Sequence, residues 1–226
     1  MKNNIEEQKE DTNEYEELET IKKQPKQNQK FNKILIFIII LSCLTNICLF
    51  YKYYTKKDFL KLAESRFSIR QFLNKPIEQE KIDALLRVAQ VAPTAENKQP
   101  QKIYIITKEE DRKKLKTVSK YTFNAPMYFI VCSDKNKAWK QKNEDYISTE
   151  IDGSIVTTHI ILEAFDLGLG SVVVRNFETE NLKKLFNIPE NMVPISLLPI
   201  GYPKEGVKPS KLHFTKNDIK DMVEYL

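Results

Sequence analysis

Hydrophobic and polar positions divide the chain into three parts. Residues 1–33 are polar and show no apolar period, so they cannot bury enough surface to offset the entropy of ordering. Residues 34–51 form one uncharged apolar run, and after it short apolar segments alternate with charged ones. The pattern predicts a disordered polar tail over 1–33, a helix over 34–54 and a folded domain over 55–226.

The apolar run 34–51 is just long enough to span a bilayer as an α-helix. Lys33 and Lys52 bracket it, and tyrosines follow it as an aromatic belt would. A cleaved signal peptide fits less well, because the preceding segment is long and mostly acidic, and a buried helix is the other alternative. We therefore expect a single transmembrane helix with the lipid bilayer as its partner. Lysines flank both ends in similar number, so the orientation does not follow from charge.

Apolar periodicity after residue 55 predicts a mixture of helices and strands. The helix expected over 151–167 is apolar nearly all round, which places it at the centre of the domain, and Gly168 and Gly170 fit its C-terminal cap. The other expected helices are 58–65, 76–92, 108–118 and 179–186, and the expected strands are 103–107, 127–133, 171–174 and 193–200. This mixture predicts an α+β domain.

Composition excludes several classes of function. The net charge of +5 is spread along 226 residues and forms no basic stripe, so we expect no nucleic-acid partner. Three cysteines and two histidines show no spacing for a disulfide framework or a metal site. No Gly-x-Gly-x-x-Gly or Gly-x-Ser-x-Gly motif is present, and the chain has only five glycines. If a phosphate binds here, side chains must hold it.

The segment Arg66–Arg70 supplies such side chains. In an extended segment, alternate side chains lie on one face, so Arg66, Ser68 and Arg70 can point the same way. Two guanidiniums and a hydroxyl on one face suit a ligand that carries a phosphate. Taken alone, the pattern also fits a solvated basic face or a kinase target.

Three further blocks follow in a fixed order: residues 92–100 (APTAENKQP), 168–171 (GLGS) and 198–203 (LPIGYP). Together with Arg66–Arg70 they resemble the FMN-dependent nitroreductase family, over about residues 58–215. The resemblance implies a three-layer α+β sandwich with a mostly antiparallel central sheet. It also implies a homodimer with FMN at the interface and NADH or NADPH as co-substrate.

The resemblance implies a role for each part of the site. Arg66 and Ser68 would hold the phosphate and ribityl chain, and Arg70 would lie beside the flavin ring, where a fixed cation raises the reduction potential. The block from Pro93 would reach the FMN of the other subunit, and residues 174–176 would face the ring through backbone N–H groups. The implied cofactor-binding residues are Arg66, Phe67, Ser68, Arg70, Pro93, Thr94, Ala95, Asn97, Val174, Arg175, Asn176, Lys208 and Lys211.

The sequence therefore predicts a membrane-anchored oxidoreductase that passes reducing equivalents from NAD(P)H to nitroaromatic, quinone or similar electron-poor acceptors. No catalytic acid–base residue is expected, and residues 134–150 match a variable lid. The folded domain is expected on the cytosolic side, where FMN and NAD(P)H are supplied. One alternative is a reductive dehalogenase resembling iodotyrosine deiodinase, although the segment between Gln99 and Met127 is too short for its lid. The other is a non-enzymatic flavin-binding membrane module.

Overall fold

The computed structural model describes residues 26–54 and 59–226, which belong to two separate units, 1–57 and 58–226. In the first unit a helix runs from Lys26 to Tyr54, so the helical prediction is confirmed, although the helix begins well before residue 34. The predicted disorder of residues 26–33 is wrong, because they belong to this helix, and the rest of the predicted tail, residues 1–25, lies outside the described residues. Within the ranges 26–54 and 59–226, no helix combines the length and apolar character that a membrane crossing requires. The predicted transmembrane helix is therefore not supported.

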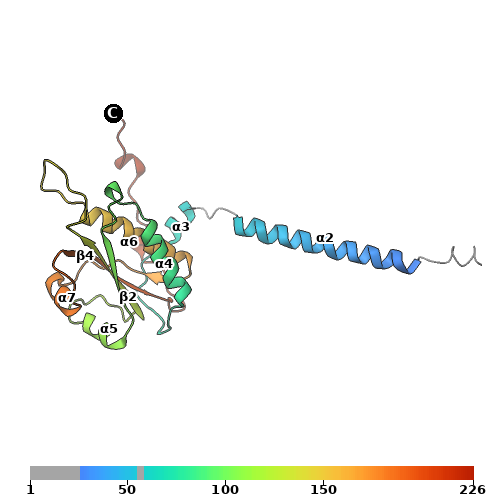
Figure 1. Cartoon of the computed structure of the whole chain (residues 1–226), viewed down its shortest axis with the longest axis horizontal. Helices are drawn as coiled ribbons and strands as arrows, with labels where there is room; N and C mark the ends of the chain where they lie inside the picture. Colours follow the sequence, from blue (N-terminus) through green and yellow to red (C-terminus); the bar gives the residue numbers. More distant parts are fainter. Residues whose placement is uncertain (1–25, 55–58) are drawn as a thin grey trace, which may run out of the picture. The chain divides into compact units, whose positions relative to one another are not determined.

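The second unit holds four strands and the helices that cover them (Figure 1). Its elements, in chain order, are α3 (Phe59–Ser65), α4 (Gln79–Val91), η1 (Ala95–Asn97), β1 (Gln101–Ile106), α5 (Glu109–Leu115), β2 (Met127–Asp134), α6 (Thr149–Asp166), β3 (Gly170–Ser171), α7 (Thr179–Leu185), β4 (Met192–Gly201), η2 (Lys211–Phe214) and η3 (Ile219–Asp221). Every helix predicted from periodicity is present, with bounds shifted by a few residues.

The strands form one sheet in the order β1-β2-β4-β3, and all three neighbouring pairs are antiparallel. The long strands β2 and β4 lie at its centre, and β2 is buried along its whole length. The predicted strand 171–174 is shorter than expected: β3 covers only Gly170 and Ser171, and Val174 then makes an isolated bridge to Leu197.

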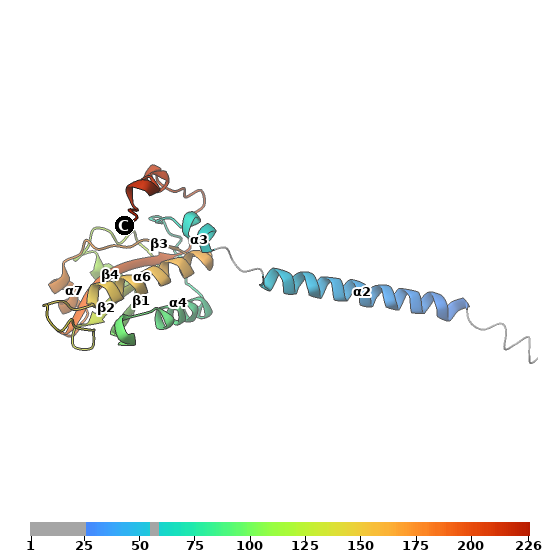
Figure 2. The same ribbon diagram turned by 90° about the horizontal axis from the view of Figure 1, so that it is seen from above.

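Alternation along β2 divides the core into two layers. Tyr128, Ile130 and Cys132 face the cluster that includes α5 and α7. Met127, Phe129 and Val131 face the cluster that includes α4 and α6. Because successive side chains of a strand point to opposite faces, one apolar strand serves both cores. The predicted three-layer α+β sandwich is confirmed, with α4 and α6 on one side of the sheet (Figure 2).

Two glycines after α6 have different roles. Gly168 has φ +74°, the left-handed conformation of a helix C-cap, as predicted. Gly170 was also expected in the cap, and that expectation is wrong. It begins β3, and a Cβ built there would lie 2.6 Å from Ile69 Cγ1. Gly170 thus allows the segment around Ile69 to pack closely on the sheet.

Candidate functional site

The segment Arg66–Arg70 is extended and lies beside β3. Ser68 pairs in parallel with Ser171, and the Ile69 N–H donates to the Ser171 carbonyl at 3.0 Å. Phe67 and Ile69 point into the core, and Ile69 is buried. Since side chains alternate, Arg66, Ser68 and Arg70 lie on the opposite face. This alternation supports the common face of the three residues, which stays a prediction.

The charges on this face are not neutralised by neighbours. Among residues 59–226, neither Arg66 nor Arg70 forms an ion pair with a carboxylate. Arg70 is exposed, and its Nη1 makes only a long local bond to the Ser68 carbonyl, at 3.5 Å. Two free guanidiniums beside a half-buried hydroxyl fit the phosphate of FMN.

The C-terminal segment carries two of the predicted basic residues and contacts Phe67. The ring of Phe67 lies 6.1 Å from the ring of His213 in η2, with the two planes tilted by 63°. This contact places η2, which begins at Lys211, against the Arg66–Arg70 segment. Lys208 lies exposed in the connection just before η2. Both lysines thus lie on a segment that meets Phe67, and their approach to the arginine face stays a prediction.

Residues 174–176 form the turn that follows β3. The Val174 N–H donates to the Leu197 carbonyl at 2.9 Å, so this N–H is already used within the sheet. In the described part of the chain, the N–H groups of Arg175 and Asn176 donate to no atom. These two N–H groups are therefore the ones that can still donate hydrogen bonds to a flavin ring. The Arg175 side chain donates to the Pro194 carbonyl at 2.9 Å and to Glu150 Oε1 at 3.2 Å, which fixes the turn against α6.

The loop 93–100, called the flavin loop below, has an unusual backbone. Glu96, Asn97 and Gln99 have φ values of 49°, 54° and 47°, the left-handed region that costs non-glycine residues free energy. Internal bonds help to hold this shape, because the Gln99 N–H donates to Thr94 Oγ1 at 3.0 Å and Gln99 Nε2 donates to Asn97 Oδ1 at 2.9 Å. Such strain persists only where surrounding contacts enforce it.

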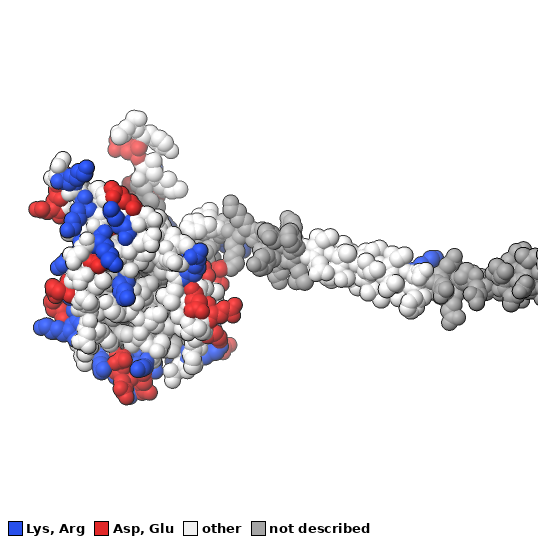
Figure 3. Space-filling view, in the orientation of Figure 1, with Lys and Arg blue, Asp and Glu red and all other residues white. Residues whose placement is uncertain are grey.

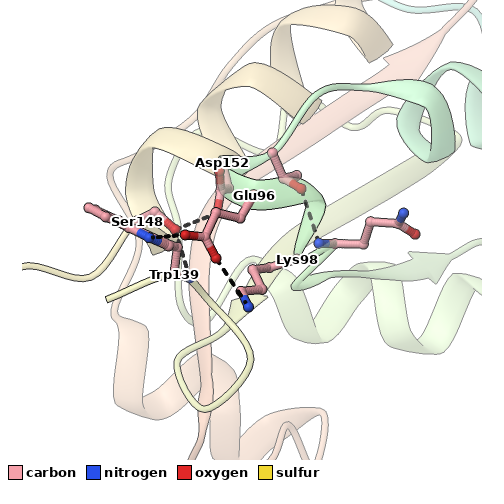
Figure 4. A network of polar contacts seen from close by, with 7 residues as sticks. Glu96, Lys98, Trp139, Ser148 and Asp152 are labelled. Atoms are coloured by element: carbon pink, nitrogen blue, oxygen red, sulfur yellow. Dashed lines mark hydrogen bonds and ion pairs between the residues drawn. The ribbon is translucent and has the colours of Figure 1, made fainter. Parts of the chain in front are cut away.

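Asp152 provides the main contact that enforces it (Figure 4). This carboxylate is 1% exposed in the first turns of α6. It accepts the Ala95 N–H at 2.9 Å and the Ser148 hydroxyl at 2.6 Å. Ser148 Oγ in turn accepts the Trp139 N–H at 3.1 Å, and Trp139 Nε1 donates to Glu96 Oε1 at 3.0 Å. One buried carboxylate thus connects the flavin loop to the lid.

Residue-type patterns did not single out Asp152. Its only signal in the sequence is a carboxylate near the start of an otherwise apolar helix, where it also interacts favourably with the helix dipole. The partner, Ala95, is distant along the chain and contributes only a backbone N–H. The side-chain types in a sequence do not predict a hydrogen bond that a main-chain N–H makes to a distant carboxylate.

The predicted site residues fall into groups at the two ends of α6. Phe67 packs on Phe165 near the C-terminal end, with ring centroids 6.4 Å apart. The flavin loop is attached to Asp152 near the N-terminal end. At 1.5 Å per residue these attachment points are roughly 20 Å apart along the helix axis. One chain therefore does not bring the flavin loop to its own arginines.

Three observations on the described residues outside this site bear on other kinds of chemistry. His159 donates through Nδ1 to the Ile155 carbonyl of its own helix at 2.9 Å, so its ring is hydrogen-bonded locally. Burial raises the pKa of the Cys132 thiol to about 12, so it stays protonated and unreactive at neutral pH. No group of metal-binding side chains occurs in the described ranges.

Comparison with known proteins identifies the family of this chain. The Nitroreductase family model matches residues 63–122 and 119–202. A protein of Methanothermobacter thermautotrophicus, provisionally named NADH dehydrogenase/NAD(P)H nitroreductase, is 30% identical over 72% of this chain and 89% of its own length. The crystal structure of a nitroreductase family protein from Clostridium difficile is 36% identical over 74% of this chain and 98% of its own, with a TM-score of 0.70. The structure of an Exiguobacterium sibiricum protein in complex with FMN shares the fold, with a TM-score of 0.66 and 20% identity over 76% of this chain and 99% of its own. This chain belongs to the nitroreductase family.

Proposed function

We propose that this chain, an FMN-dependent NAD(P)H oxidoreductase of the nitroreductase type, delivers reducing equivalents to nitroaromatic, quinone or similar electron-poor acceptors. The observation that carries the proposal is the arginine face of Arg66, Ser68 and Arg70, which has no carboxylate partner among the described residues. A Bacillus subtilis relative, 25% identical over 66% of this chain and 67% of its own length, is named FMN reductase [NAD(P)H].

When bound, FMN supplies the hydride and electron chemistry that no side chain can provide. The protein's residues bind and orient it. Arg66 and Ser68 hold the phosphate. Arg70 places a fixed positive charge beside the flavin ring, which becomes more negative when it is reduced. The N–H groups of Arg175 and Asn176 present donors to the polar edge of the ring. No described residue needs to act as a general acid or base.

The test uses the purified full chain loaded with FMN under anaerobic conditions. We expect the yellow colour to bleach on addition of NADH or NADPH and to return when a quinone or nitroaromatic is added. A protein that holds FMN but is bleached by neither donor would reject the proposal and favour a flavin-holding module.

Arg66→Ala and Arg70→Ala should have different effects. Loss of the half-buried Arg66 removes a phosphate contact, and we expect FMN affinity to fall by about a hundredfold, or roughly 3 kcal/mol. Loss of the exposed Arg70 should leave most FMN bound but lower the flavin potential and slow turnover. Fluorescence titration with FMN and spectroelectrochemistry measure the two effects. Arg87→Ala, an exposed change on α4, is the control, and equal effects of both site variants would contradict the division of roles.

We also propose that two copies pair to complete each site. The attachment points on α6 support this, because antiparallel packing of two α6 helices would bring each flavin loop to the other copy's arginine face. The exposed residues along α6 support it too, since Ile151 is 55% exposed and lines a cavity of about 420 Å³ with His159.

The C-terminal segment carries apolar side chains that the domain does not cover. Ile219, Met222 and Tyr225 are 75%, 70% and 95% exposed. We expect deletion of residues 217–226 to raise the dimer dissociation constant at least about a hundredfold, because burying each such side chain contributes about 1.5–3 kcal/mol. Sedimentation equilibrium measures the change. A K220A/D221A double variant should stay dimeric, and an unchanged dimer after the deletion would exclude this segment from the interface.

Membrane attachment through residues 34–51 and a cytosolic position of the folded domain are proposed from the sequence. The uncharged apolar run supports the first, and the supply of FMN and NAD(P)H supports the second. Carbonate extraction of membranes from cells that make the full chain tests attachment, and release into the supernatant would reject it. Protease protection of residues 59–226 in sealed vesicles tests the side.

A further inference from the structure

A cavity of about 640 Å³ lies between the flavin loop and the lid. Its volume is in the range of sites that bind nucleotide-sized ligands. Its lining is polar and basic, and the residues are Glu96, Lys98, Asn136, Lys137, Ala138, Trp139, Lys140, Gln141, Lys142 and Asn143. We call this the lid pocket. It is distinct from the arginine face, which lies near the other end of α6.

Positive charge dominates the lid pocket. Four lysines face it and only one carboxylate, that of Glu96, which Lys98 already pairs at 3.3 Å. Lys140 and Lys142 form no ion pair with any described residue. Basic side chains, with some acidic ones among them, lie over this side of the domain, where the loop between β2 and α6 projects (Figures 1 and 3). Like charges brought together without partners favour an anionic ligand.

The aromatic wall of the lid pocket is held in place. Trp139 Nε1 donates to Glu96 at 3.0 Å, and the indole packs edge-on against Tyr146, with ring centroids 6.3 Å apart. The base of the lid is also fixed, because Lys140 pairs with Ile147 and the Gln141 N–H donates to the Tyr146 carbonyl at 3.0 Å. An indole with a fixed orientation offers a flat surface on which a base can stack.

We propose that the lid pocket binds the phosphorylated adenosine end of NADPH, with the 2′-phosphate on Lys140 and Lys142 and the adenine on Trp139. The chain would then prefer NADPH to NADH. The proposal rests on the proposed function, which requires a nicotinamide donor. Three observations support it: Lys140 and Lys142 have no ion-pair partner among the described residues, the indole of Trp139 has a fixed orientation, and the pocket borders the flavin loop. In the proposed dimer, that loop lies at the FMN of the other copy. A dinucleotide with its nicotinamide at that FMN would extend its other end toward the lid.

An anionic electron acceptor is the other ligand that this charge could serve. It differs from NADPH because it enters after the donor has left and needs no adenine-sized aromatic surface. The two are separated by measuring the reductive and the oxidative half-reactions independently.

The experiment uses the single tryptophan of the chain as its reporter. Adenosine 2′,5′-bisphosphate, titrated into the full-length FMN-loaded protein, should quench Trp139 fluorescence, whereas 5′-AMP should bind at least about tenfold more weakly. In the K140Q/K142Q variant we expect the affinity for the bisphosphate to fall by about tenfold, because two exposed charge contacts contribute about that much together. Lys184→Gln, on the exposed side of α7, is the matched control and should change nothing.

Stopped-flow bleaching then gives the consequence for donor choice. K140Q/K142Q should lower the rate with subsaturating NADPH about tenfold and leave the rate with NADH unchanged. Equal binding of the bisphosphate and 5′-AMP, or equal rates with NADPH in both proteins, would overturn the proposal. A change confined to reoxidation by an anionic quinone would overturn it in favour of the acceptor. If NADH still bleaches the flavin normally in all these cases, the proposed oxidoreductase function stands. A failure of the lid-pocket proposal can therefore be distinguished from a failure of the proposed function.

Discussion

Replacing Asp152 with alanine is expected to lower the free energy of unfolding by about 3 kcal/mol, because two bonds to a buried carboxylate are lost and one buried and one partly buried donor are left unpaired. Those donors are the Ala95 N–H and the Ser148 hydroxyl. Without them the left-handed backbone at Glu96 and Asn97 loses the contact that enforces it. We therefore also expect weaker FMN binding and a higher KM for the donor.

The second effect separates a positioning role from a merely structural one. FMN affinity and KM are measured well below the melting temperature, where the variant is still folded. Asp152→Asn keeps one acceptor oxygen for Ala95 and should lose about 1–2 kcal/mol of stability with a smaller change in KM. Glu144→Ala, an exposed carboxylate of the lid, is the control. A lower melting temperature with unchanged FMN affinity and KM would assign Asp152 to the fold alone.

The elements that periodicity predicted well are those whose packing is uniform along their length. β2 lies between two core layers, so both of its faces are apolar and it is visible as a continuous run. The sheet, α4 and Phe67 cover much of the helix α6, which explains most of its apolar positions, whereas Ile151 lies on a face that this chain leaves exposed. In such elements the side-chain types carry the tertiary information.

The predicted residues of the site were less complete, because much of the site is made by backbone. The arginine face follows from alternation over five residues, and the bridge at Ser68 and the burial of Ile69 agree with that alternation. The flavin loop depends on φ values that its residue types do not suggest, and on a bond from a main-chain N–H to Asp152. Likewise, only the structure shows that the Val174 N–H donates to the Leu197 carbonyl, whereas the N–H groups of Arg175 and Asn176 have no acceptor among the described residues.

The expectation for residues 34–51 illustrates another limit of patterns. An uncharged run predicts a helix because all of its backbone bonds can be made locally, and α2 confirms that helix. The pattern does not decide whether such a helix crosses a membrane, and among the described residues no helix has the length and apolar character for a crossing.

Gly170 is the position where the smallest change should disturb the arginine face. An alanine Cβ there would lie 2.6 Å from Ile69 Cγ1 and 2.7 Å from Ile69 Cβ and Cγ2. Ile69 is buried and β-branched, so it has no other rotamer that clears all three contacts. The segment 66–70 must then move away from β3, which breaks its bond to Ser171. We expect Gly170→Ala to cost about 3 kcal/mol of stability and to reduce FMN affinity at least about tenfold.

The matched control lies two residues away. Gly168→Ala adds the same methyl group, but nothing lies within 4 Å of it, so only the left-handed backbone at φ +74° is penalised. That variant should lose about 1 kcal/mol of stability and bind FMN normally. Thermal denaturation measures the loss of stability in both variants, and FMN titration measures the loss of affinity. Only Gly170→Ala, which displaces the arginine face, should show both losses. If Gly170→Ala bound FMN as tightly as Gly168→Ala does, the close packing of Ile69 on β3 would not be what positions Arg66 and Ser68.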